Sequence, residues 1–396
     1  MSLEQTILEE NISDDESFNN HSNNFYFIEK EELIGTGAGI EVWLGFRITP
    51  YDYERIAVKV YSRKHSLNSL RREVNLAKAL SSHDGIGRIF SYDFDKISKK
   101  GQVLMEYISG NNLSDVMKKH RNNFINLHFP QRLAAFIGFE CSKSLDYAHK
   151  TIVYDEKGKN SIGLIHRDIS PQNIIITQTG YPKIIDFGLG ILSSDVGEKE
   201  IIGKVAGKLG FIAPEMFEKK QIDFSADIYS LGMTIDYLIR GRNPLLDGID
   251  CSADYLSSLN IVMNNMQKGF NTLKEENKYV DGELSAIISK AVESDLNKRY
   301  KTMEDFHRDI TDYLYVRGPT KLGPTREALQ NYIEFINTPG FESNIFLLIS
   351  GKEFYFHEEL KRKFEKLREL VPYMNKAGKF CLERITKNDE EGFIYL

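Results

Sequence analysis

The sequence predicts a mixed α+β protein with a small strand-rich unit carrying one helix, a larger helical unit and a helical extension. From Phe25 to about Tyr107, β-branched and aromatic stretches alternate with turns, and one strongly helical segment interrupts them. After Asn112 the pattern changes to long helical periods. These two patterns place most of the sheet before most of the helices.

The boundaries follow from composition. Residues 1–24 carry six acidic residues and no lysine or arginine, which predicts a disordered acidic tail. The folded region is expected over 25–317, with its two units at 25–108 and 109–317. The glycines and prolines of RGPTKLGPTREAL predict a linker, so 318–396 is expected to be a linker and a helical extension.

Each element is assigned from its own periodicity. Strands of the first unit are expected in FYFIEKEELI, EVWLGFRI, RIAVKVY and QVLMEY, with the helix in SLNSLRREVNLAKAL. Helices of the second unit are expected in LSDVMKKH, QRLAAFIGFECSKSLDYAHK, FSADIYSLGMTIDYLIRG and ELSAIISKAVESDL. The short strands NIIIT and YPKIIDF flank the turn QTG. In the extension, HEELKRKFEKLRELV places apolar residues on one helical face.

Composition limits the classes of function. The 396 residues suffice for two or three units or one large bilobal domain. A net charge of −6 supplies no broad basic surface, so nucleic acid is not an expected partner. Three cysteines without metal-ligand spacing predict reduced thiols. With no signal peptide and no apolar run of membrane length, we expect a cytoplasmic protein without membrane contact. A secreted bacterial effector that needs no cleavable signal is the alternative.

The stretch IGTGAGIEVWLG, from Ile34 to Gly45, is a candidate phosphate-binding loop. Glycines after a strand let the backbone approach phosphate oxygens closely, because no Cβ obstructs them. Taken alone the stretch is weak evidence, because a hairpin turn explains three glycines in five residues equally well.

Lys59 is the second candidate, because it sits in the otherwise apolar strand RIAVKVY. Such a lysine must be paired or must lie on an edge of the sheet. Glu73 in the following helix is an available partner, and the pair would place an ammonium group for phosphate binding.

The stretch IHRDISPQNIII, followed by KIIDFGLG, carries the strongest signal. Asp168 and Asn173 are five residues apart, and Asp186 follows eighteen residues after Asp168. A hydroxyl nucleophile needs a carboxylate beside it, and Mg²⁺ needs hard oxygen ligands. A polar turn or a salt-bridged loop explains any one of these residues, but the combination predicts a catalytic loop.

At this point the chain resembles the protein kinase family, most closely bacterial serine/threonine kinases of eukaryotic type. The resemblance covers about Phe25 to Val316 in the family's order. It comprises the Gly-rich loop GTGAGIEV, AVKV, VLMEYI, HRDISPQN, DFG, APE (Ala213 to Glu215) and NKRY. It implies the bilobal protein kinase fold, with an N-lobe at 25–108 and a C-lobe at 109–317.

The resemblance also implies a role for each matching residue. Asp168 would orient the substrate hydroxyl and accept its proton, and Glu73 would hold Lys59 against the α- and β-phosphates. Asn173 and Asp186 would bind Mg²⁺, with Mn²⁺ as an alternative. The implied ATP-binding residues are Ile34, Gly35, Gly37, Val42, Ala57, Lys59, Met105, Glu106, Ile108 and Ile175. The implied structural residues are Glu215, which pairs with Arg299, and Asp227, which braces the catalytic loop.

The sequence departs from the family pattern at three positions. Ile40 stands at the third glycine of the loop, and Gly39 comes one residue early, so the loop tip is expected to differ. Ser170 stands where serine/threonine kinases carry a lysine that contacts the γ-phosphate. Lys208 stands where they carry a threonine. We hypothesise that the Lys208 ammonium replaces the missing charge; the alternative is a solvent-exposed Lys208 beside a tolerated Ser170.

The segment between Asp186 and Glu215 contains the regulatory candidates Ser193 and Ser194. Arg167 predicts an anion-binding pocket that receives a phosphoserine or an acidic side chain. Asp195, Glu198 and Glu200 are the acidic candidates, so autophosphorylation and acidic mimicry both stay open.

The sequence therefore predicts an ATP- and Mg²⁺-dependent kinase that phosphorylates serine and threonine in protein substrates and itself. The alternative from another class is a pseudokinase or scaffold that binds nucleotide and a partner without efficient transfer. A small-molecule kinase is disfavoured, because the expected Glu215 and Arg299 pair supports a segment that presents a peptide. The C-terminal extension is a possible contact for a regulatory partner.

Overall fold

A computed structural model describes most of the chain between residues 26 and 337. The described residues are 26–37, 39–48, 53–61, 67–95, 97, 100–123, 129–154, 160–195, 207–217, 222–250, 253–278, 280–317 and 324–337. The expected N-terminal tail and the helix in HEELKRKFEKLRELV lie outside this range. The described chain folds as two compact units. The first runs to Ser81 and includes Gly87–Ile108; the second comprises Ser82–Ile86 and the residues from Ser109 onward.

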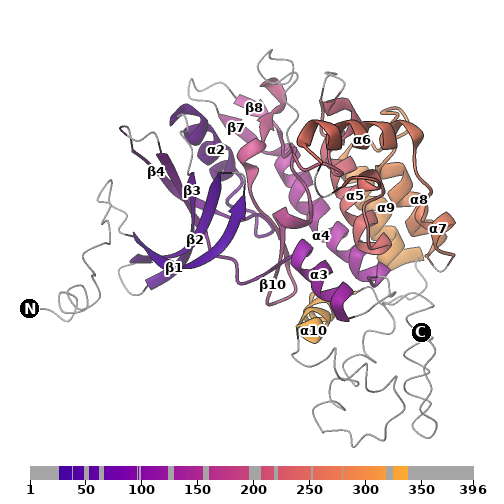
Figure 1. The fold of residues 1–396 in the computed structure, drawn as a ribbon, viewed down its shortest axis with the longest axis horizontal. Helices are drawn as coiled ribbons and strands as arrows, with labels where there is room; N and C mark the ends of the chain where they lie inside the picture. The colour runs from indigo at the N-terminus through magenta and orange to yellow at the C-terminus, as the bar shows by residue number, and fades with distance from the viewer. Residues whose placement is uncertain are drawn as a thin grey trace, which may run out of the picture. The chain divides into compact units, whose positions relative to one another are not determined.

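The first unit is an antiparallel sheet with one helix (Figure 1). In sheet order its strands are β1 Tyr26–Gly37, β2 Ile40–Ile48, β3 Tyr53–Tyr61, β5 Lys100–Glu106 and β4 Ile89–Asp95. The helix is α2 Leu67–Ala79, which contacts β4 and β5. The strand β4 was not among the expected ones, although its sequence IFSYDFD alternates aromatic residues with serine and aspartate, as a half-buried strand does.

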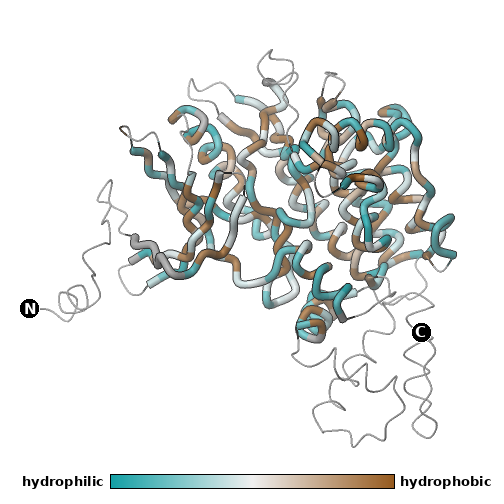
Figure 2. The backbone as a smooth tube through the Cα atoms, viewed as in Figure 1, coloured by the Kyte–Doolittle hydropathy of each residue, from teal (hydrophilic) through white to brown (hydrophobic). Residues whose placement is uncertain are grey.

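The central strand β3 is buried on both faces, which explains its nearly continuous apolar run. Ile56 and Val58 form a core with Leu104 of β5. In Figure 2 the brown stretches mark such hydrophobic segments along the strands. At the tip of the β1–β2 hairpin, Gly37 pairs with Ile40 and Gly39 has a φ of 79°, a conformation that favours glycine.

The second unit is mainly helical (Figure 1). Its helices are α3 Leu113–Asn123, α4 Gln131–Lys150, α5 Ser225–Arg240, α6 Tyr255–Lys268, α7 Leu273–Glu276, α8 Gly282–Ala291, α9 Met303–Thr311 and α10 Arg326–Ile336, with a π-helical turn at Asp312–Arg317. The expected helices are present as α3, α4, α5 and α8. The helices α6, α7, α9 and α10 were not assigned from the sequence.

Three small antiparallel sheets complete this unit. Their strands are β6 Gly110–Asn112 with β10 Ile174–Thr177 and β11 Pro182–Ile184, β9 Leu164–Ile165 with β12 Ile191–Leu192, and β7 Ile152–Tyr154 with β8 Asn160–Ile162. The strands β10 and β11 are the expected hairpin around the turn QTG. The β7–β8 hairpin follows directly after α4, where the sequence analysis assigned no element.

Close packing of α5 against its neighbours depends on two glycines. A Cβ on Gly138 of α4 would lie 2.3 Å from Ile235, and a Cβ on Gly232 of α5 would lie 2.8 Å from Ala291 of α8. Such distances are far below a normal carbon contact, so both glycines let the helices approach closely. The helix α5 is thereby packed closely between α4 and α8, and it carries Asp227 in its first turn.

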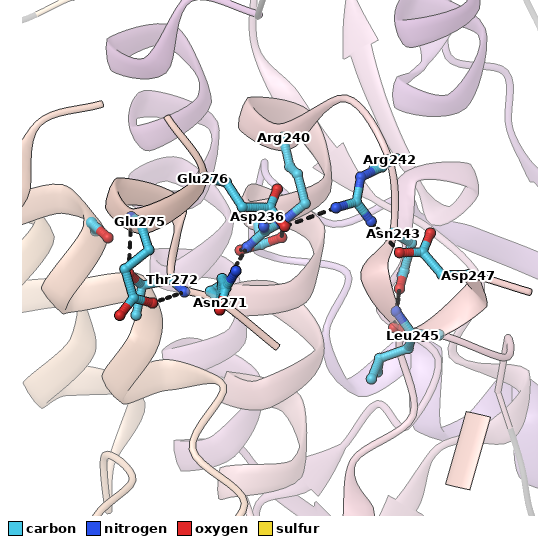
Figure 3. A network of polar contacts seen from close by, with 12 residues as sticks. Asp236, Arg240, Arg242, Asn243, Leu245, Asp247, Asn271, Thr272, Glu275 and Glu276 are labelled. Atoms are coloured by element: carbon cyan, nitrogen blue, oxygen red, sulfur yellow. Dashed lines mark hydrogen bonds and ion pairs between the residues drawn. The ribbon is translucent and has the colours of Figure 1, made fainter. Parts of the chain in front are cut away.

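The C-terminal end of α5 is fixed by the network of charged and polar side chains in Figure 3. Asp236 accepts hydrogen bonds of 2.7 and 2.9 Å from Arg240, and Arg240 also donates to the Asn271 backbone at 3.0 Å. Glu276 of α7 pairs with both Arg240 and Arg242. The network therefore ties α5 to α7 and to the loop after α5. Among the described residues, no helix has the length and apolar content needed to cross a bilayer.

Candidate active site

The first group of candidate residues lies on one face of the first unit's sheet. Lys59 of β3 is opposite Val42 of β2, and Ala57 is opposite Met105 of β5. Because opposite residues and alternate residues of a strand share a face, these four side chains point to the same side. Gly35 is opposite Val42 in β1, and a Cβ there would be 3.6 Å from the Val42 side chain.

Lys59 is paired and does not lie on an edge. It sits in the middle of the sheet, 6% exposed, and its Nζ donates to Glu73 Oε1 at 2.9 Å. Glu73 lies on α2 and is equally buried, so each charge compensates the other in a site with little water. The interpretation of Lys59 as an edge residue is therefore wrong.

Tyr61 is a residue of this group that the sequence analysis missed. Its hydroxyl donates to Glu73 Oε2 at 2.5 Å, and the Lys59 Nζ lies 5.3 Å from its ring centre. Burial raises the pKa of Tyr61 well above its usual range. Lys59 and Tyr61 are two residues apart on β3, so their side chains point to the same face of the sheet. This strand period was the sequence signal that could have identified Tyr61.

The backbone after β5 is the expected contact for an adenine edge. The Glu106 amide already donates to the Arg88 carbonyl at 2.9 Å. If the Glu106 backbone contacts an adenine edge, its carbonyl group is therefore the one that accepts a hydrogen bond. Ile108 follows at the end of the first unit, and Ile34 lies in β1 with an exposed side chain.

The catalytic-loop candidates lie in the second unit between β9 and β10. Asp227, fully buried in α5, accepts hydrogen bonds from the amides of His166 at 2.8 Å and Arg167 at 2.9 Å. It also contacts His149 Nε2 at 2.8 Å. Arg167 has a φ of 65°, a strained conformation that these bonds hold in place. The loop geometry thus depends on α5 and on the end of α4.

Asp168 presents its two carboxylate oxygens differently. Oδ2 accepts from Asn173 Nδ2 at 2.7 Å and from Lys208 Nζ at 3.1 Å. Oδ1 is buried and accepts no hydrogen bond from any described residue. Asn173 Nδ2 also donates to the Asp168 carbonyl at 2.8 Å, which fixes the loop around the carboxylate. The protein therefore holds Oδ2, whereas Oδ1 is buried without a described donor.

Asp186 and Asn173 come from the two ends of the β10–β11 hairpin. The Ile185 amide donates to the Asn173 carbonyl at 2.9 Å, which holds the two ends together. Asp186 has a φ of 67°, and its Oδ1 accepts from the Gly188 amide at 3.2 Å. Ile175 lies on β10, opposite Asn112 of β6.

The oxygens of this loop suit a divalent cation. Asn173 Oδ1 accepts from the Lys208 ammonium at 3.1 Å, so a positive charge already lies against the amide oxygen. The described residues contain no group of three or more His, Cys, Asp or Glu side chains that could form an all-protein metal site. Mg²⁺ that is bound with a nucleotide takes one or two carboxylates plus phosphates and waters, so Asn173 and Asp186 fit it.

The regulatory candidates lie against the β7–β8 hairpin. The Ser193 amide donates to the Gly163 carbonyl at 3.0 Å and its hydroxyl donates to the Ile162 carbonyl. The Ser194 amide donates to Ser161 Oγ at 3.3 Å. Arg167 Nε donates to the Leu189 carbonyl at 2.8 Å. The Asp195 side chain, Glu198 and Glu200 are not among the described parts of the chain.

The expected pair of Glu215 and Arg299 is formed and buried. Arg299 donates from two nitrogens to the two Glu215 oxygens at 2.8 and 3.1 Å, and it also donates to the Ser225 and Glu293 carbonyls. Arg299 is 2% exposed and Glu215 3%. This pair anchors the end of the segment that begins at Asp186.

Comparison with known proteins agrees with this geometry. A family model described as "Protein kinase domain" matches residues 28–309. The crystal structure of the Mycobacterium tuberculosis PknI kinase domain aligns with a TM-score of 0.51 at 19% identity, covering 76% of this chain and 98% of that one. This likeness concerns the fold, and it confirms the predicted α+β kinase fold class.

Curated relatives share about a quarter of their aligned residues with this chain. They include the serine/threonine-protein kinase PknA of Corynebacterium glutamicum, 27% identical over 219 residues, and the tyrosine-protein kinase MasK of Myxococcus xanthus, 26% over 287 residues. The serine/threonine-protein kinase PknB of Mycobacterium leprae is 24% identical over 289 residues. These matches cover 54%, 71% and 71% of this chain and 42% of each relative, so the chain spans less than half of their length.

Proposed function

Because this chain belongs to the protein kinase family, we propose that it transfers the γ-phosphoryl group of ATP to serine or threonine hydroxyls of protein substrates, itself included. The observation that carries the proposal is the Asp168 carboxylate, which has Oδ2 held by Asn173 and Lys208 and a buried Oδ1 without a described partner. A carboxylate held in this way has the chemistry of a group that receives a hydroxyl proton.

The transfer step uses this carboxylate directly. The substrate hydroxyl donates to the Asp168 carboxylate, its oxygen forms a bond to the γ-phosphorus, and the bond from that phosphorus to the β-phosphate oxygen breaks. The hydroxyl proton passes to Asp168, and the products are phosphoprotein and ADP. Asn173 and Asp186 would hold Mg²⁺, which neutralises phosphate charge when bound, and Mn²⁺ is the alternative ion.

Nucleotide binding involves the face of the sheet that carries Lys59. The Lys59 ammonium, held by Glu73, would bind the α- and β-phosphates. Val42, Ala57 and Met105 share that face and would contact the adenine. The remaining proposed contacts are Ile34, Gly35, Gly37, the Glu106 carbonyl, Ile108 and Ile175.

Serine and threonine are the proposed acceptors because most of the curated relatives described above carry that name. The tyrosine-protein kinase MasK makes tyrosine the alternative acceptor. Identification of the phosphorylated residues by mass spectrometry after incubation with ATP and Mg²⁺ separates the two. Phosphoserine and phosphothreonine support the proposal, whereas phosphotyrosine alone overturns the acceptor class.

Asp168→Asn tests whether transfer occurs at this site. Its transfer from radiolabelled ATP to itself and to generic protein substrates should fall by roughly 10²–10⁴-fold. Asp247→Asn is the matched control, because Asp247 lies in the same unit in an exposed ion pair. Binding of ATP by both variants, measured by calorimetry, checks that the nucleotide is still held. Bound ATP with no transfer by the unmodified chain would instead indicate a scaffold.

A further inference from the structure

Lys208 forms an ion pair with the candidate catalytic carboxylate in the described second unit. Its Nζ lies 3.1 Å from Asp168 Oδ2 and 3.1 Å from Asn173 Oδ1. Its side chain is 34% exposed, so the ammonium keeps access to water and to a ligand on one side. The alternative of a lysine that merely extends into solvent does not describe this geometry.

The catalytic loop itself offers no lysine near Asp168. Ser170, two residues after Asp168, is fully buried, and its hydroxyl has no hydrogen-bond partner among the described residues. The ammonium that pairs with this carboxylate therefore comes from a different segment, the one that ends at Glu215.

Contacts of the backbone around Lys208 place the start of its side chain beside the catalytic loop. Gly207 has a φ of 108°, and a Cβ there would lie 2.7 Å from the Arg167 carbonyl. After Lys208, the Phe211 amide donates to the Lys208 carbonyl at 3.0 Å. Asn243 then donates to the Gly210 carbonyl at 2.8 Å. The segment thus passes close to the catalytic loop at Gly207.

We propose that Lys208 is a catalytic residue that binds the γ-phosphate of the nucleotide, and that Asp168 and Asn173 hold its ammonium in place before the nucleotide arrives. This proposal rests on the proposed kinase function. The ammonium lies 3.1 Å from the carboxylate that would receive the substrate proton, and the flexible four-carbon stem of lysine lets it turn toward a phosphoryl group bound there. Positive charge at that group stabilises the transition state.

A consequence concerns control of the reaction. The γ-phosphate charge of this chain comes from the segment between Asp186 and Glu215, not from the catalytic loop. Any change that shifts Lys208 away from Asp168 therefore removes the charge while leaving Asp168 and Asn173 in position. The conformation of the segment between Asp186 and Glu215 therefore determines whether the Lys208 charge reaches the γ-phosphate.

Binding of ATP and ADP tests the proposal independently of transfer. In Lys208→Met, the ratio of the ADP dissociation constant to the ATP dissociation constant, measured by calorimetry with Mg²⁺, should fall by about tenfold or more, because one charged hydrogen bond to the γ-phosphate is lost. ADP affinity should stay unchanged. Lys208→Arg keeps the charge and should keep the ratio. Lys143→Met is the matched control, because Lys143 is a similarly exposed, paired lysine of the same unit.

Turnover provides the second readout. In Lys208→Met, kcat should fall by roughly 10²–10³-fold, as for loss of one donor to the transition state. Gly207→Ala should also lower the affinity ratio, because its added Cβ would clash with the Arg167 carbonyl and shift the backbone next to Lys208, whereas Gly248→Ala should not. Gly248 also has a positive φ, 83°, but nothing lies within 4 Å of its added Cβ. An unchanged affinity ratio in Lys208→Met overturns the proposal. If the ratio of dissociation constants falls in Lys208→Met but the unmodified chain shows no phosphoryl transfer, Lys208 is still a γ-phosphate ligand. Only the proposed kinase function is then overturned.

Discussion

The Tyr61 hydroxyl donates a 2.5 Å hydrogen bond to Glu73 Oε2, while Lys59 Nζ occupies the other oxygen of the same carboxylate at 2.9 Å. Both donors come from β3 and the acceptor comes from α2. The carboxylate is buried, so each oxygen needs its partner. Tyr61 is therefore a positioning residue that holds Glu73 at Lys59 even in the absence of a nucleotide.

Removing the Tyr61 hydroxyl should weaken this arrangement. Tyr61→Phe leaves one buried carboxylate oxygen of Glu73 without its donor, which should cost about 1–3 kcal/mol in the free energy of unfolding. ATP affinity should fall as well, because Lys59 is held less firmly. Urea unfolding and calorimetric titration with ATP measure the two effects.

Tyr313→Phe is the matched control for that change. Tyr313 is fully buried in the second unit, and its hydroxyl has no hydrogen-bond partner among the described residues. Loss of this hydroxyl should leave the stability unchanged within about 0.5 kcal/mol and ATP affinity unchanged. Equal behaviour of the two variants would contradict a positioning role for Tyr61.

The buried pair of Arg299 and Glu215 should contribute far more than an exposed pair. Arg299→Met leaves the Glu215 charge buried without compensation, which should cost about 3–5 kcal/mol. Arg242→Met removes the exposed pairs with Asp247 and Glu276 shown in Figure 3 and should cost about 0–1 kcal/mol. Chemical unfolding of both variants measures the difference.

A double variant separates the pair from its surroundings. If the cost of Arg299→Met arises from the isolated Glu215 charge, then adding Glu215→Gln should recover part of the lost stability. Strictly additive losses would show instead that Arg299 stabilises mainly through the Ser225 and Glu293 carbonyls, to which it also donates.

The carboxyl of Asp227 predicts a pH dependence of stability. Burial alone would raise its pKa, but the hydrogen bond and charge of His149, together with His166, outweigh burial and hold the pKa below its usual range. Since the unfolded chain then binds more protons near pH 4, this contribution is complete above the unfolded pKa and is lost as the pH falls toward the folded pKa.

Asp227→Asn isolates that contribution. At pH 7 it should destabilise the protein by about 3 kcal/mol or more, because three donors lose a charged acceptor. The difference between the two proteins, measured by urea unfolding from pH 7 to pH 3, should stay constant down to about pH 4 and then shrink. A difference that grew on acidification would contradict the lowered pKa.

The sequence predicted the parts of this site that depend on local spacing. The loop from His166 to Asn173 and the pair of Lys59 and Glu73 follow from strand and turn patterns with fixed intervals. The contacts of Tyr61 and Lys208 could not be ranked in the same way, because many tyrosines and lysines of the chain fit the same local pattern. Their partners are set by packing of segments that are distant in sequence.

The fold shows the same division. Long periodic helices such as α4 and α5 were predicted, whereas β7, β8 and β4 were not. The strands β7 and β8 have three residues each, too few for a clear alternation, whereas the alternation of aromatic and polar residues in β4 was missed. Pairing with a neighbouring strand decides their conformation.

The final prediction concerns α10, which lies beyond the residues that the family model matches. Tyr332 of α10 is 1% exposed, its hydroxyl lies 2.5 Å from His120 Nδ1 of α3, and Leu329 beside it is fully buried. A helix packed in this way stabilises the second unit through apolar burial. Leu329→Ala should therefore cost about 2–5 kcal/mol in the free energy of unfolding, and Tyr332→Phe about 0.5–1.5 kcal/mol.

Glu327→Ala serves as the control on the exposed face of the same helix and should change stability by less than about 0.5 kcal/mol. Urea unfolding of the full chain measures all three variants. If Leu329→Ala behaved like Glu327→Ala, α10 would not be part of the cooperative unit. The contacts of Arg326 with Glu140 and with the Tyr181 ring would then be surface contacts of little energy. If only Leu329→Ala and Tyr332→Phe lower the free energy of unfolding, α10 is instead a structural part of the unit that carries Asp168.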